Sequence, residues 1–195
     1  IFYADPTKSS VLSVAEPQAF GFLNANPAAI SLDRSALSVP DGQTLSIIAG
    51  DINVQNDPTS PTYSYYTLSA PGGRINLVSV ASSGEVNLST PDTASFAKLG
   101  NITFSNGANV NVSSSDGTTP AGTVVIRGGQ ILFQNSAIDA TGNPGGSIDI
   151  KGESLQVDNA SFNLSTYGDV DHPGTACKID VSGDFIMKND SWIES

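Results

Sequence analysis

The sequence predicts an all-β protein folded as a parallel β-helix, a solenoid whose short strands wind around a narrow core. The main observation is an internal repeat, because residues 123–138 align without a gap with residues 147–162. Within both copies apolar and polar residues alternate, as they do in strands that bury one face. A repeat this short cannot bury its apolar face alone, whereas stacked copies share a continuous core.

Each copy is predicted to contain three short strands separated by corners. The first apolar pair of the copy recurs along the chain as Leu45/Ile47, Ile75/Leu77, Ile102/Phe104, Val124/Ile126, Ile148/Ile150 and Ile179/Val181. These pairs predict about six coils, which strand pairing would space ~4.8 Å apart.

The N-terminal part of the chain precedes the repeats. Residues 1–29 contain Asp-Pro, Glu-Pro and Asn-Pro pairs and no repeat, which predicts an extended capping segment. Phe20 and Phe22 are expected to cover the first coil, because an open solenoid end must be capped. Residues 30–39 match the back half of a repeat. Residues 30–195 are therefore predicted to form one β-helix domain.

Two stretches interrupt the repeat. Residues 57–66 delay the third strand of the coil that opens at Thr44, and they contain Tyr63, Tyr65 and Tyr66. The pattern is weakest in residues 78–99, and it is clear again from Gly100 to the end of the chain.

An asparagine follows the second predicted strand in several coils. Asn tolerates the left-handed backbone of a tight corner, and its side chain can bond to an Asn one coil away. The sequence therefore predicts a structural asparagine ladder formed by Asn56, Asn135, Asn159 and Asn189.

Composition limits the classes of partner. Eight basic residues against 19 acidic ones give a net charge of −11, which argues against nucleic acid and anionic membranes. No apolar run approaches the ~20 residues that span a bilayer. The single cysteine excludes an internal disulfide. Because the chain starts at Ile1 without Met, it is expected to be a piece of a longer protein.

Several residues could in principle carry chemistry. Polysaccharide lyases and hydrolases with this fold need clustered carboxylates beside cations. Asp149 and Asp180 are predicted to share one outward column, and Arg127 and Lys151 the next. Columns two charges deep are better explained as solvated faces. No catalytic, metal or cofactor site is therefore predicted.

The remaining reactive or aromatic residues have simpler explanations. His172 lies in a loop with two aspartates but without the glycine-terminated pattern of a calcium loop. Cys177 has no second His to activate it. Trp192 is predicted to occupy the core column of Ile138 and Phe162.

A ridge of loops is the predicted interaction surface. Residues 113–121, 142–146 and 167–175 each lie between the end of one coil and the first strand of the next, so they are expected along one edge. Loops on one side of a solenoid commonly bind partners. The candidate ridge residues are Asp116, Tyr167, Asp169, Asp171 and His172, and the rival site is the loop with Tyr63, Tyr65 and Tyr66.

Four stretches resemble a known family. They are Phe20 to Ile30, Leu37 to Leu45, Ala70-Pro71-Gly72-Gly73-Arg74-Ile75-Asn76-Leu77-Val78-Ser79-Val80-Ala81-Ser82, and Gly145-Gly146-Ser147-Ile148-Asp149-Ile150. These stretches resemble the large filamentous-haemagglutinin-like exoproteins of Gram-negative bacteria and cyanobacteria. The resemblance runs from about Phe20 to the end of the chain.

The resemblance implies a right-handed parallel β-helix that a partner outer-membrane transporter exports by two-partner secretion. It also implies a secreted or cell-surface protein with a haemagglutinin-like, structural and adhesive role. The Asn-Pro-Asn-Gly and Asn-Pro-Asn-Leu motifs of the family's secretion domain do not occur here, so the chain resembles the β-helix downstream of that domain. Host or neighbouring-cell glycans or proteins are the implied partners. A glycan-binding module and a carbohydrate-active enzyme remain the alternatives.

Overall fold

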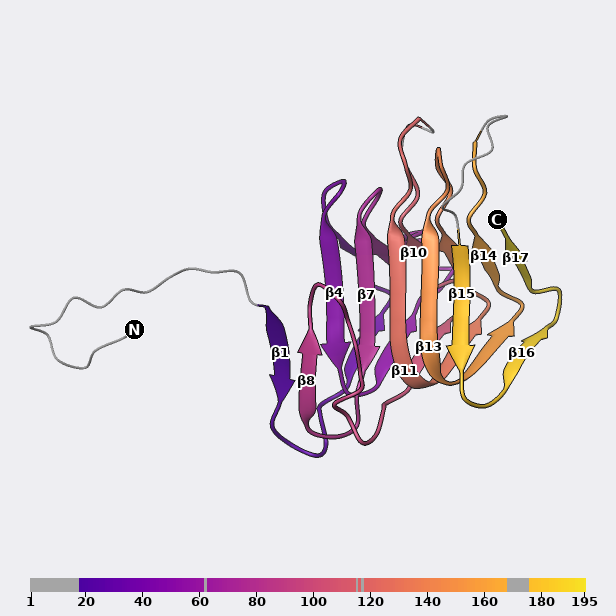
Figure 1. The fold of residues 1–195 in the computed structure, drawn as a ribbon. Helices are drawn as coiled ribbons and strands as arrows, with labels where there is room; N and C mark the ends of the chain where they lie inside the picture. The colour runs from indigo at the N-terminus through magenta and orange to yellow at the C-terminus, as the bar shows by residue number, and fades with distance from the viewer. Residues whose placement is uncertain (1–17, 62, 115, 117, 168–175) are drawn as a thin grey trace, which may run out of the picture.

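The structure is a computed structural model that describes residues 18–61, 63–114, 116, 118–167 and 176–195. These residues form an all-β fold with mostly parallel sheets (Figure 1), and they contain no helix that could cross a membrane. The strands are β1 (Ala19–Phe22), β2 (Ile30–Asp33), β3 (Leu37–Ser38), β4 (Thr44–Ala49), β5 (Ile52–Gln55), β6 (Leu68–Ser69), β7 (Arg74–Ser79), β8 (Gly84–Asn87), β9 (Ile102–Ser105), β10 (Val110–Asn111), β11 (Thr123–Gln134), β12 (Ala137–Asp139), β13 (Ser147–Asp158), β14 (Ser161–Asn163), β15 (Ala176–Val181), β16 (Phe185–Lys188) and β17 (Trp192–Glu194).

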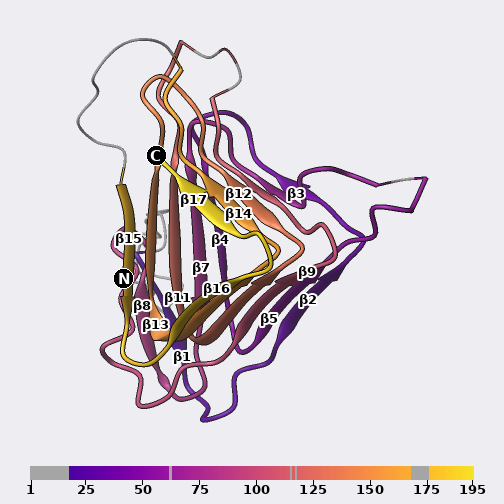
Figure 2. The ribbon, with the colours of Figure 1, turned by 90° about the vertical axis from the view of Figure 1, so that its right-hand side faces the viewer.

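Most strands lie in three parallel rows, which form three sides of the cross-section (Figure 2). The first row contains β4, β7, the first halves of β11 and β13, and β15. The second row contains β2, β5, β9, the second halves of β11 and β13, and β16. The third row contains β3, β6, β10, β12, β14 and β17. Each side therefore buries one face of a parallel sheet.

The two copies recognised in the sequence are neighbours in the sheet. Strand β11 pairs with β13 in the alignment that the sequence predicts, with Ile126 opposite Ile150 and Phe133 opposite Val157. Both strands continue from the first row into the second, and Gly128 and Gly152 stand opposite each other between their two halves. The internal repeat therefore fixes the register in this part of the fold.

The structure corrects the position of Ile102 and Phe104. These residues pair with Ile131 and Phe133, so β9 belongs to the second row. Strand β7 pairs directly with β11 in the first row. The chain between β7 and β9 is therefore an insertion, and its strand β8 pairs antiparallel with β1. Every row places alternate residues inward, so the alternation of Ile102 and Phe104 could not show which row they occupy.

The last repeat also differs in register from the prediction. Cys177 pairs with Ile148 and Ile179 with Ile150, so Cys177 and Ile179 form the inward pair. At the following corner both Asn189 and Asp190 have a positive φ. Ile193 then pairs with Phe162, whereas Trp192 is exposed. The prediction that Trp192 lies in the core is wrong, because a shift of one residue turns a strand's side chains to the other face.

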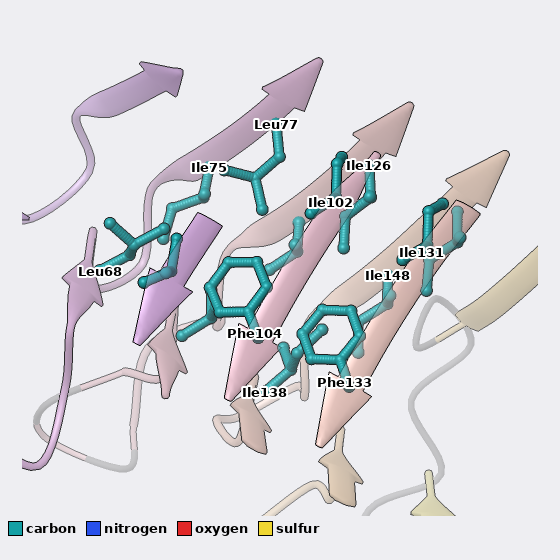
Figure 3. Packing of buried hydrophobic residues seen from close by; sticks show 14 of the residues in the cluster. Leu68, Ile75, Leu77, Ile102, Phe104, Ile126, Ile131, Phe133, Ile138 and Ile148 are labelled. Atoms are coloured by element: carbon teal, nitrogen blue, oxygen red, sulfur yellow. The ribbon is translucent and has the colours of Figure 1, made fainter. Parts of the chain in front are cut away.

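The core is a set of aliphatic and aromatic columns that cross the stacked strands (Figure 3). Phe104 and Phe133 stack almost parallel with ring centroids 4.9 Å apart, and Phe162 meets Phe133 edge-on at 5.0 Å. Each fully buried side chain of this size contributes about 1.5–3 kcal/mol relative to exposure. Burial of these columns supplies the driving force for folding, which a single short strand could not supply by itself.

A second, smaller cluster lies between β7 and the insertion. Val78, Val80, Val86 and Phe96 are buried there, and Phe22 packs against them from β1. Ile48 and Val78 occupy outward positions of the first row, so the pair β1–β8 covers part of that row's outer face. This explains why residues 78–99 match the repeat poorly, because their apolar side chains serve a different cluster.

The rows expose apolar side chains at both ends. At the N-terminal end Phe20, Ile30 and Leu37 are 51%, 38% and 41% exposed. Phe20, Ile30, Leu37 and Leu45 help to line an apolar groove of about 460 Å³ there. At the other end Phe185 and Met187 of β16 are exposed, although they continue the columns of Leu155 and Val157. Phe20, which is predicted to cover the first coil, therefore lines the edge of an open end.

Candidate functional site

A column of left-handed residues follows the second row. Positive φ angles occur there at Asn106, Asn135, Asn159, Asn189 and Arg34. Asn adopts this conformation more readily than other residues with side chains. Asn159 Nδ2 also donates a hydrogen bond to Asn135 Oδ1 at 2.7 Å. The structure thus brings two of the predicted ladder residues together.

The other two predicted ladder residues have different roles. Asn56 is not among the residues with positive φ, and its buried Nδ2 donates to the carbonyl of Ser64 and to the hydroxyl of Thr67. Asn189 Nδ2 donates to Asp158 Oδ1 at 2.6 Å rather than to Asn159. This hydrogen bond is the main reason that the pKa of Asp158 is lowered. Asn56 therefore fastens the loop that follows it, and the extra residue at Asp190 directs Asn189 elsewhere.

Sequence reasoning missed Asn106 and Arg34 as members of the column. Asn106 was missed because Ile102 and Phe104 were assigned to a first strand, which hides the corner behind them. The Asn106-Gly107 dipeptide is itself a signal for a positive φ, and both residues have one. Arg34 offers no such signal.

Asn159→Ala is expected to lower the free energy of unfolding by about 1–2 kcal/mol. The change removes the hydrogen bond to Asn135 and places a less tolerant residue at a φ of 47°. Chemical denaturation of the variant measures the effect. Asn53→Ala is the control, because Asn53 is exposed on β5 and has no positive φ. Equal losses in the two variants would contradict a stabilising role for the Asn135–Asn159 pair.

Described parts of the predicted ridge, residues 118–121, 142–146 and Tyr167, are neighbours at one edge of the fold (top of Figure 1). The Asn143 N–H donates to the carbonyl of Thr119, and the Ala121 N–H donates to the carbonyl of Pro144. The Tyr167 N–H donates to the carbonyl of Gly142. Backbone hydrogen bonds therefore join the first loop to the second and the second to the start of the third. Asp169, Asp171 and His172 lie outside the described residues.

Asp116 and Tyr167 are both engaged within the protein. Asp116 Oδ1 accepts hydrogen bonds from the N–H groups of Thr118 and Thr119 and from the Thr119 hydroxyl. These donors hold the pKa of Asp116 well below its ordinary value. The Tyr167 ring is about half exposed, and its hydroxyl donates to Thr141 Oγ1 at 3.0 Å. Asp116 therefore acts as the anchor of a turn.

Asp116→Asn is expected to reduce the pH dependence of hydrogen-exchange protection in this turn. Because the folded-state pKa lies below the unfolded value of about 3.9, the carboxylate stabilises the turn above that pH. The contribution is lost as the pH falls through the folded-state pKa. Hydrogen-exchange protection of the Thr118 and Thr119 amides should therefore fall between about pH 5 and pH 2 in the natural chain. An identical pH response in the variant would contradict this role, and Asp180→Asn on β15 is the control.

The rival loop, of which residues 57–61 and 63–66 are described, projects from the corner between the second and third rows (Figure 2). Tyr66 reaches across to β12, where its hydroxyl donates to Asp139 Oδ2 at 2.8 Å. Burial, followed by this hydrogen bond, raises the pKa of Tyr66. The Tyr63 hydroxyl donates to the carbonyl of Gly107 at 3.4 Å. Tyr65 lies against both rings and is 60% exposed.

A polar groove of about 580 Å³ lies at the same corner. Its lining comes from four neighbouring strands of the second row and the residues that follow them. The lining residues are Asp33, Arg34, Gln55, Asn56, Asp57, Pro58, Asn106, Gly107 and Asn135. The groove therefore combines side-chain amides with two carboxylates and one guanidinium group.

The outer face of the first row carries a second groove, of about 400 Å³. The predicted column of Asp149 and Asp180 is wrong, because Asp149 pairs with Lys178 and Asp180 pairs with Lys151. Arg127 is opposite Lys151, as predicted. Its guanidinium group forms an ion pair with Asp149 at 2.7 Å. Each of the two aspartates therefore has a cation beside it, and they do not form a carboxylate pair.

Within the described residues, the structure indicates neither a metal centre nor a reactive thiol. No group of three or more His, Cys, Asp or Glu side chains that could hold a metal ion occurs within the described part of the chain. Cys177 is half-buried on β15, and burial raises the pKa of its thiol. A raised pKa leaves less of the nucleophilic thiolate near neutral pH.

Comparisons with protein-family models, with curated proteins and with solved structures find no match to this chain.

Proposed function

We propose that this chain is a section of a right-handed parallel β-helix of about six coils, and that it forms the shaft of a large bacterial exoprotein. In this proposal the parent protein is secreted or attached to the cell surface and has a structural and adhesive role. It is similar to the filamentous-haemagglutinin-like exoproteins and is exported by a partner outer-membrane transporter. The shaft is not an enzyme and has no cofactor.

The open ends of the stacked strands are the observation that carries this proposal. Ile30 and Leu37 at one end and Phe185 and Met187 at the other are exposed members of apolar columns that are buried between them. Among the residues that the structure describes, the strands at both ends also have a parallel partner on one side only. Terminal repeats that face water need a polar outer surface. Apolar ends are therefore suited to contact with further repeats.

The sides of the fold support a shaft that is in contact with water. Positions that alternate with the core columns carry polar side chains such as Asn53, Gln130 and Glu153. The net charge of −11 favours solubility and disfavours association with polyanions. Adhesive partners of such a shaft are host or neighbouring-cell glycans or proteins.

Surface labelling of intact producing cells tests the proposal. Antibodies raised against the purified chain should label unpermeabilised cells, or detect the protein in the medium. Deletion of the partner transporter should abolish both signals while the protein remains detectable after permeabilisation. Detection only inside permeabilised normal cells would overturn the proposal. Turnover of acidic or neutral polysaccharides by the purified chain would favour the enzyme alternative.

A further inference from the structure

We define the tyrosine corner as residues 57–61 and 63–66 together with the polar groove beside them. It contains an exposed aromatic ring, that of Tyr65, which is held in place. Tyr65 packs edge-on against Tyr63, with centroids 6.5 Å apart, and against Tyr66, at 4.9 Å. Both neighbours are fastened to other parts of the fold through their hydroxyl groups. Asn109 Nδ2 also donates to the Tyr65 carbonyl at 3.0 Å. The ring is thus preorganised, which reduces the entropy lost when a ligand binds.

The loop also forms a wall of the polar groove. Pro58 lines the groove directly, and both Pro58 and Tyr63 lie over Gly107 in the turn after the neighbouring strand β9. A Cβ atom at Gly107 would meet Pro58 Cγ at 2.8 Å, and the φ of Gly107 is 80°. A glycine is therefore required where the loop closes onto the corner. This close approach places the aromatic cluster beside the groove.

The polar groups of the groove suit a ligand rich in hydroxyl groups. The second-row strands behind it are spaced ~4.8 Å apart, so the lining residues form a row of regularly spaced donors and acceptors. Amides both donate and accept, as hydroxyl groups do. The Asn106 side chain makes no hydrogen bond to any residue that the structure describes at this corner. Its amide is therefore free for a ligand.

The charges of the corner favour a neutral ligand. The groove contains Asp33 and Asp57 against one cation, Arg34, whose Nε lies 3.4 Å from Asp33 Oδ1. The chain as a whole carries a charge of −11. Both local and overall charge disfavour uronic acids and sulfated sugars. An exposed tyrosine ring offers a flat apolar surface against which the C–H face of a sugar ring can pack.

We propose that the tyrosine corner binds a neutral oligosaccharide, which packs on Tyr65 and extends over the amides of the groove. This inference deepens the adhesive role proposed above, but it concerns binding by the isolated chain. If the corner binds no sugar, the shaft can still lie at the cell surface. If the protein is found only inside the cell, binding can still occur in solution.

Isothermal titration calorimetry of the 195-residue chain tests the proposal with neutral hexasaccharides of glucose, mannose, galactose and xylose, and with hexagalacturonate as the acidic probe. At least one neutral hexasaccharide should bind, and its affinity should be nearly independent of salt. Tyr65→Ala should weaken that binding about tenfold, because it removes the exposed ring. Asn106→Gly should weaken it severalfold while it preserves the left-handed backbone.

Matched controls separate local from general effects. Tyr167→Ala removes a half-exposed tyrosine at the loop ridge, and Asn189→Gly removes another left-handed asparagine outside the groove. Both should bind like the natural chain. The proposal is overturned if none of the neutral hexasaccharides binds at millimolar concentration, or if Tyr65→Ala and Asn106→Gly bind unchanged. Salt-sensitive binding of hexagalacturonate alone would also overturn it and would point to the charged groove of the first row.

Discussion

Val124→Asp is expected to abolish folding. Val124 is fully buried on β11, and it stands between Ile75 and Ile148 on the neighbouring strands. A carboxyl group at this position would have no ion partner, and burying it, charged or protonated, costs an amount comparable to the whole stability margin of a typical domain, about 5–15 kcal/mol. The variant should show no cooperative unfolding transition in circular dichroism or calorimetry.

Gln130→Asp is the control for this experiment. Gln130 lies on the same strand but is exposed. Its substitution should change the free energy of unfolding by no more than about 0.5 kcal/mol. A Val124→Asp protein that unfolds cooperatively near the natural midpoint would show that the stacked apolar columns do not determine the fold.

Gly122→Ala is expected to destabilise the protein by about 3 kcal/mol. A Cβ atom at Gly122 would overlap the carbonyl oxygen of Gly73, which directly precedes the neighbouring strand β7. The same arrangement recurs at Gly73, which faces the carbonyl of Gln43, and at Gly146, which faces the carbonyl of Gly122. The obstacle is backbone in every case, so it cannot move aside without disturbing the adjacent repeat. The midpoint of chemical denaturation measures the loss.

Gly21→Ala provides the comparison for Gly122→Ala. Gly21 lies on β1, where a Cβ atom would meet nothing within 4 Å. Alanine restricts the unfolded chain more than glycine does, so this variant should be as stable as the natural chain or slightly more stable. If Gly122→Ala were equally well tolerated, the close approach of the strands at this corner would not limit the fold.

The sequence alone determined which copies are neighbours in the middle of the chain. The alignment of residues 123–138 with residues 147–162 is the register of β11 on β13 and of β12 on β14. Asparagine at the corner also predicted the left-handed backbone of Asn135 and Asn159. Both predictions succeed because they depend on local properties, namely alternation of apolar residues and tolerance of a positive φ.

Only the tertiary structure decided which charged residues are neighbours and which residues contact the tyrosines of the candidate site. Residues 149 and 180 were expected in one column, but the register of β15 places Lys178 beside Asp149. The partners of Tyr66 and Tyr63 are distant in sequence, at Asp139 and Gly107. No local pattern encodes such contacts, because they depend on which strands become neighbours.

The row to which a strand belongs was likewise decided by the tertiary structure. Ile102 and Phe104 alternate as a first-row pair would, yet they pack on Ile131 and Phe133 in the second row. A period of two residues specifies which side chains point inward, and it is the same in all three rows. The chain between β7 and β9 forms the insertion with β8, which packs near Val78, and β7 pairs directly with β11, so the chain re-enters the fold in the second row.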